Sequence, residues 1–149
     1  MINSINKFIL IALAFFLLLI SCQKDPENLE SETNLCLVEV NGAFEDIELD
    51  QKPMFLAGED EFGKSIAENL NYPAEARENG IQGTAVLHYE ITKVGTVENI
   101  IAIEDPGGGI GDASVGAIEV GTEGVSFSPG ILDGNPVRVK KEIKLEFSL

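Results

Sequence analysis

The chain has 149 residues, of which 25 are acidic and 10 are basic, and its formal net charge is −15. The length suits one ordinary domain with a tail. The charge excludes nucleic acid as an expected partner, because phosphate backbones are held by clustered lysine and arginine. A single histidine and two cysteines are too few for a zinc cluster or a disulfide framework, so we expect no cofactor.

Residues 1–21 have the pattern of a lipoprotein signal peptide. Lys7 precedes an uninterrupted apolar run at residues 8–20. As a helix this run is about 20 Å long, short of the ~30 Å hydrocarbon core of a bilayer, which is typical of a secretory signal. It ends in Leu19-Ile20-Ser21-Cys22, which resembles the bacterial lipobox and implies lipidation at Cys22. A plain secretory signal with a chance cysteine is the alternative.

Residues 22–34 are expected to form an acidic, flexible tether, because their one large apolar residue is Leu29. Residues 35–51 follow as an N-terminal extension. Two apolar segments there flank Asn41-Gly42, a dipeptide that favours the tight turn of a β-hairpin. The two strands of this hairpin are predicted at residues 35–40 and 43–49.

Three helices are predicted in the remaining chain, residues 52–149. Apolar residues recur every four positions over residues 59–70, which indicates an amphipathic helix. Pro73 and Gly80 bracket a second, short helix. Asp112 is expected to cap a third helix that reaches residue 120 and is weakened by glycine.

Three strands are predicted from the alternation of apolar and polar residues. They are residues 83–91, 97–104 and 137–147. The last is the clearest, and Lys141 alone interrupts its apolar face. A consecutive antiparallel pair, joined by a third strand across a helix, indicates an α+β fold with its helices on one face of the sheet.

The sequence offers no set of residues that favours catalysis. Pro106 begins a glycine-rich stretch that lacks both the Gly-Lys-Ser/Thr ending of a P-loop and the GxGxxG spacing, so a plain loop is expected. His88 falls on the polar face of its strand without a second histidine, and Cys36 suits a small core residue better than a nucleophile. We therefore expect no enzyme, no catalytic residue and no metal site.

Five short motifs occur in the order that is found in one known family. They are Tyr72-Pro73-x-x-Ala76, Gly80-Ile81-Gln82-Gly83, Gly95-Thr96-Val97, Phe127-Ser128-Pro129-Gly130 and Gly134-Asn135-Pro136-Val137. Together they resemble the TonB C-terminal domain family over residues 52–149. The resemblance implies two helices packed on one face of a three-stranded antiparallel sheet.

The resemblance also implies which residues meet a partner. The family carries Gln-Tyr-Pro in its binding region, so the matching Asn71, Tyr72 and Pro73 are implied to bind the partner. The residue at the position of the family's usual tryptophan is Phe127. The implied mode of binding is β-strand addition, in which an extended peptide pairs with a sheet edge.

The last predicted strand is the expected edge. Its basic stripe includes Arg138, Lys140 and Lys144, and these cations would steer an acidic segment toward an otherwise acidic chain. The alternative is that lysines on an edge strand only prevent aggregation.

The membrane context differs from that of energy-transducing TonB proteins, which have an inner-membrane helix and a long Pro-rich spacer. A lipoprotein signal and a short tether predict an anchor in the outer membrane, with the periplasmic face favoured over the cell surface. The expected function is protein binding, in which the last strand pairs with a segment of an outer-membrane transport component in TonB-dependent transmembrane transport. The alternative is an assembly lipoprotein that uses the domain for complex formation or as a homodimer, without energised uptake.

Overall fold

The computed structural model describes residues 35–125 and 127–149. The described chain has the predicted α+β fold. Its helices are α2 (Glu59–Asn69), α3 (Ala74–Glu78) and α4 (Ile110–Gly121). Its strands are β1 (Leu35–Val40), β2 (Ala43–Glu48), β3 (Gly83–Ile91), β4 (Val97–Glu104), β5 (Gly130–Leu132), β6 (Asn135–Val137) and β7 (Val139–Phe147). The signal peptide, the tether and Cys22 lie outside the described residues and remain predictions.

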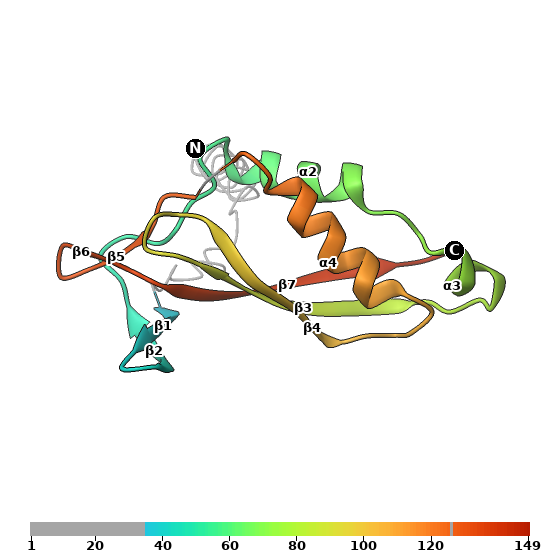
Figure 1. Cartoon of the computed structure of the whole chain (residues 1–149), viewed down its shortest axis with the longest axis horizontal. Coiled ribbons are helices and arrows are strands. Elements are labelled where there is room, and N and C mark those ends of the chain that lie inside the picture. The colour runs from blue at the N-terminus through green and yellow to red at the C-terminus, as the bar shows by residue number, and fades with distance from the viewer. Residues whose placement is uncertain (1–34, 126) are drawn as a thin grey trace, which may run out of the picture. The chain divides into compact units, whose positions relative to one another are not determined.

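The main sheet has five strands in the order β2-β1-β7-β3-β4, and all neighbours are antiparallel. The three strands that the resemblance implies are β7, β3 and β4. The predicted hairpin extends them, because β1 pairs with the start of β7 at Leu37↔Lys140 and Val38↔Val139. Helices α2 and α4 lie together on one side of the sheet, while α3 lies near the C-terminus (Figure 1).

Strand alternation explains the core. The odd-numbered residues of β3 and β7 turn toward the helices, and most of them are apolar. The largest cluster of buried residues, between sheet and helices, consists of Ile66, Ala76, Ala85, Leu87, Ile110, Ala117, Ile118 and Phe147. A second cluster is largely aromatic and consists of Phe55, Tyr89, Ile91 and Phe127. A third lies under the hairpin and consists of Val38, Leu49 and Val139.

Two of the predicted boundaries are wrong. Helix α4 begins at Ile110, with Gly109 in its cap position at a φ of 82°, so Asp112 lies in the first turn and is not the cap. The last strand begins at Val139, because Val137 belongs to a separate two-stranded ribbon of β5 and β6 that the sequence did not predict. Arg138 therefore lies at a break between two strands.

Candidate functional site

The outer edge of β7 is open over most of its length. The sequence predicted that the last strand is an edge, and this is wrong at its start, because β7 lies between β1 and β3 and β1 pairs with Val139 and Lys140. The pairing with β1 stops there. Within the part of the chain that the structure describes, no strand pairs with the outer edge of residues 141–147.

The backbone of β7 presents hydrogen-bonding groups at this open edge. The N–H of Glu39 in β1 donates to the carbonyl oxygen of Arg138 over 3.0 Å, so the backbone of Arg138 faces away from β3. Backbone groups alternate between the two sides of a strand. The N–H and C=O groups of Glu142, Lys144 and Glu146 therefore also face away from β3, toward the open edge.

Arg138 is occupied by three carboxylates of its own fold. Its Nη1 donates to Glu90 Oε2 over 2.9 Å and to Glu98 Oε2 over 3.1 Å, and its Nε lies 3.3 Å from Glu39 Oε2. These glutamates come from β3, β4 and β1. The hydrogen bond to Glu90 is the main cause that raises the pKa of Arg138 above its ordinary value. The arginine, which immediately precedes β7, thus links three strands, β1, β3 and β4.

The lysines of β7 have different surroundings. Lys140 Nζ lies 3.9 Å from the centre of the Phe44 ring in β2, which is a cation–π contact between β7 and the hairpin. Lys144 is exposed, and its Nζ lies 3.5 Å from Glu142 Oε1. Lys141, on the helix side, has no ion-pair partner among the described residues. Lys141 therefore remains available to a partner at the open edge, whereas Lys144 would share or exchange its exposed ion pair with Glu142.

The Asn71-Tyr72-Pro73 segment lies at the other end of β7. The Tyr72 ring packs edge-on against Phe147 with centroids 5.6 Å apart, and its hydroxyl donates to the Ile81 carbonyl oxygen over 2.6 Å. Asn71 is exposed. The six candidate binding residues thus form no single site: Asn71, Tyr72 and Pro73 flank the far end of the open edge, whereas Arg138 and Lys140 lie at its covered end.

The Tyr72 hydroxyl should contribute to folding. Tyr72→Phe removes its hydrogen bond to the Ile81 carbonyl and should lower the free energy of unfolding by about 1 kcal/mol. Tyr72→Ala, which also removes the ring from Phe147, should cost about 3 kcal/mol. Urea titration of both variants measures these losses. A Tyr72→Phe variant with unchanged stability and weakened partner capture would instead assign the hydroxyl to the partner.

A hollow of about 280 Å³ adjoins β7 and was missed by sequence reasoning. We call it the aromatic hollow, and its lining is Phe55, Phe62, Gly63, Tyr89, Phe127, Lys141, Glu142 and Ile143. The only sequence signal for it was the resemblance, which marks Phe127. Its aromatic residues come from four separate segments, so no local pattern could have revealed it.

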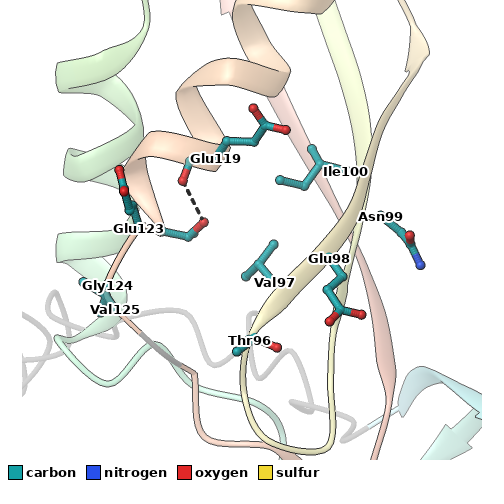
Figure 2. Close-up of a pocket in the computed structure, with 10 residues that line it drawn as sticks. Thr96, Val97, Glu98, Asn99, Ile100, Glu119, Glu123, Gly124 and Val125 are labelled. Carbon is teal, nitrogen blue, oxygen red and sulfur yellow. Dashed lines mark hydrogen bonds between the residues drawn. The ribbon is translucent and has the colours of Figure 1, made fainter.

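A second hollow, of about 510 Å³, lies between the start of β4 and the end of α4 (Figure 2). Glu98, Glu119 and Glu123 line it, and the C-terminal end of a helix adds further negative charge. The lining has no basic residue. An acidic peptide or a phosphate would be repelled there, so this hollow is not the site for an acidic segment.

The groups considered for chemistry have structural roles. Asp105 Oδ1 accepts hydrogen bonds from the N–H groups of Gly107 and Gly111 at 2.8 and 2.9 Å, so a carboxylate already occupies the glycine-rich loop. Burial raises the pKa of the Cys36 thiol, although the charge of Lys141 lowers it in part. The thiol is therefore protonated at neutral pH, which disfavours nucleophilic chemistry.

Neither a metal site nor a membrane span is found in the described part of the chain. Residues 35–125 and 127–149 contain no group of three or more histidine, cysteine, aspartate or glutamate residues that could hold a metal ion. None of the helices described combines the length and the apolar character needed to cross a bilayer.

Comparisons with known proteins identify the family. The model of the Gram-negative bacterial TonB protein C-terminal family matches residues 68–149, more than half of the chain. The NMR solution structure of the Helicobacter pylori TonB C-terminal domain is similar at 19% sequence identity and a TM-score of 0.45, covering 60% of this chain and 80% of that chain. No curated protein matches. Since the family match contains all five motifs in order, the chain belongs to the TonB C-terminal domain family.

Proposed function

We propose that this chain is a membrane-anchored protein-binding module that pairs β7 with an extended segment of an outer-membrane transport component. The observation that carries the proposal is the open edge of residues 141–147. It offers backbone donors and acceptors in the alternating arrangement that an added strand requires. TonB C-terminal domains bind other proteins, and the family is a non-enzymatic interaction module, which supports this mode of action.

The cations of the open edge, Lys141 and Lys144, would favour acidic residues at the positions of the partner segment that face them. Lys144 is exposed beside this edge, and its side chain is 67% accessible. Arg138 and Lys140 have partners within the fold, so we assign them mainly to stability. Asn71, Tyr72 and Pro73 would meet the segment where it passes Phe147.

We further propose that lipidation of Cys22 anchors the domain in the outer membrane on its periplasmic side. TonB C-terminal domains are periplasmic in envelope systems, which supports this face. Cys22→Ala should abolish acyl labelling and release the chain from the membrane fraction. Unchanged labelling and fractionation would contradict the anchor, and loss of the domain on protease treatment of intact cells would contradict the periplasmic face.

Proline at Lys144 should remove partner binding without unfolding the domain. The N–H of Lys144 faces away from β3, so Lys144→Pro deletes a donor for an added strand and leaves the β3–β7 ladder intact. Lys144→Gln is the matched control, because it removes the charge and keeps the N–H. We expect crosslinked outer-membrane receptor recovered from intact cells to fall about ten-fold or more in the proline variant and about two-fold in the glutamine variant.

Two results would contradict the proposal. A folded proline variant, checked by urea titration, that captures as much receptor as the wild type would exclude strand addition at this edge. Capture of other lipoproteins or of a second copy, without any receptor, would favour the alternative of an assembly lipoprotein.

A further inference from the structure

The aromatic hollow lies where the side chains of an added strand would point. On one side it is bordered by Lys141, Glu142 and Ile143 of β7, and on the other by Phe62 and Gly63 of α2. Neighbouring strands lie about 4.8 Å apart, and directly opposite side chains point to the same face of the sheet. A residue opposite Ile143 would therefore project toward the helices, into the hollow.

The walls of the hollow suit an apolar side chain. Four rings of the lining pack against one another in tilted and edge-on arrangements, with centroid distances from 5.1 Å between Phe55 and Phe127 to 6.4 Å between Tyr89 and Phe127. Three of these rings are almost fully buried, whereas Phe62 remains partly exposed. The edges and faces of such rings favour a further aromatic or branched aliphatic group.

A glycine keeps the hollow open. Gly63 lies in α2 with an ordinary helical conformation, and a Cβ built there would meet nothing within 4 Å. Glycine in a helix costs about 1 kcal/mol relative to alanine. Because Gly63 has no side chain, the space beside Phe62 on this face of α2 is empty. A side chain of the partner therefore has room to enter the hollow there.

Charge at the rim restricts the neighbours of that side chain. Lys141 borders the hollow and has no ion-pair partner among the described residues. Glu142 is the other charged residue of the lining. Its Oε1 lies 3.5 Å from Lys144 Nζ and its Oε2 lies 3.4 Å from His88 Nε2. The charge of Lys141 therefore favours acidic over basic partner residues next to the apolar side chain that enters the hollow.

Resting on the proposed strand addition, we propose that the aromatic hollow is a specificity pocket for the partner. It takes one aromatic or branched aliphatic side chain from the added strand, at the position opposite Ile143. The backbone ladder supplies binding that tolerates many sequences, and this pocket selects the segment and fixes its register along β7.

Synthetic peptides test this pocket on the full chain purified in detergent. The peptides have about ten residues, enough to span the open edge, and contain threonine, valine and aspartate with one test position moved along the sequence. At one register we expect a peptide with phenylalanine at that position to bind ten- to a hundred-fold more tightly than its alanine counterpart. Fluorescence anisotropy measures both affinities.

A filled pocket should lose this preference and keep strand addition. Gly63→Leu should reduce the difference between phenylalanine and alanine peptides to less than about three-fold, with the affinity for the alanine peptide unchanged. Gly63→Ala, a smaller and helix-favouring change, should reduce it in part. Gly116→Leu is the matched control, since Gly116 also lies in a helix with nothing within 4 Å of its Cβ, and it should keep the full preference.

The outcomes separate the pocket from the proposed function. Equal binding of phenylalanine and alanine peptides to the wild type, with both weakened by Lys144→Pro, would overturn the pocket and leave strand addition standing. Binding unaffected by Lys144→Pro, or no binding of either peptide, would overturn both. A dimer of the full chain that Gly63→Leu dissociates would show that a second copy fills the pocket, which also overturns the inference.

Discussion

Gly95→Ala should lower the free energy of unfolding by more than about 3 kcal/mol. Gly95 lies in the turn between β3 and β4 with a φ of 85°, a left-handed conformation that costs other residues about 1 kcal/mol. A Cβ there would also fall well inside van der Waals contact with the carbonyl oxygen of Phe127. That carbonyl cannot easily move, because the N–H of Phe127 donates to the Gly95 carbonyl oxygen over 2.8 Å.

Gly134→Ala is the matched control for Gly95. Gly134 also has a left-handed φ, of 73°, but nothing lies within 4 Å of a Cβ built there. Its replacement should therefore cost only the conformational part, about 1 kcal/mol. Urea titrations measure the unfolding free energies of the two variants, which are compared at the same dependence on urea concentration. Equal losses would contradict the close approach of the turn to Phe127.

The same contact connects the turn with the candidate site. The hydrogen bond from Phe127 to Gly95 holds the ring that stands at the family's tryptophan position, and this ring lines the aromatic hollow. Gly95→Ala is thus expected to disturb the fold and the pocket together. In any Gly95→Ala protein that still folds, preference for a phenylalanine peptide should fall along with stability.

Local patterns predicted the elements well where the pattern was long. The bounds of β3 and β4 match the predicted ranges, because alternation over eight or nine residues is hard to mistake. The ribbon of β5 and β6 was missed, since each strand has only three residues. The pairing of β1 with β7 was also missed, because it joins segments about a hundred residues apart and leaves no periodic signal.

The candidate site was predictable only in part. The open edge of β7 follows from the alternating last strand and the family resemblance. The surroundings of its charges do not, because sequence gives the charge of Arg138 but not the three glutamates around it. The aromatic hollow depends on aromatic side chains from four segments, on β7 and on the absence of a side chain at Gly63, so only the folded chain brings it together.

Arg138→Leu should lower the free energy of unfolding by about 2 kcal/mol at neutral pH. Leucine keeps part of the packing but leaves Glu39, Glu90 and Glu98 without their shared cation. Loss of one partner costs about 3–5 kcal/mol in a fully buried ion pair. The Arg138 side chain is 26% exposed and that of Glu90 is 12% exposed. Solvent screening should therefore reduce the loss of unfolding free energy to about 2 kcal/mol.

The pH dependence of this loss should identify its cause. The pKa of Arg138 is raised in the folded chain, chiefly by its hydrogen bond to Glu90. Because its pKa is raised on folding, the arginine contributes fully to the free energy of unfolding at every pH below its ordinary pKa. This contribution is lost only in strong alkali. The difference in unfolding free energy between wild type and Arg138→Leu should therefore stay constant through neutral and mildly alkaline pH and shrink only in strong alkali.

Arg77→Leu provides the control for Arg138→Leu, because Arg77 is exposed and its Nη2 makes one hydrogen bond, to the Tyr72 carbonyl oxygen over 3.0 Å. It should cost less than about 1 kcal/mol. If Arg138→Leu is as stable as the wild type at neutral pH and yet captures less receptor, its cation serves the partner and not the fold. The basic stripe would then act at both ends of β7, and strand addition would have to displace β1 from Val139 and Lys140.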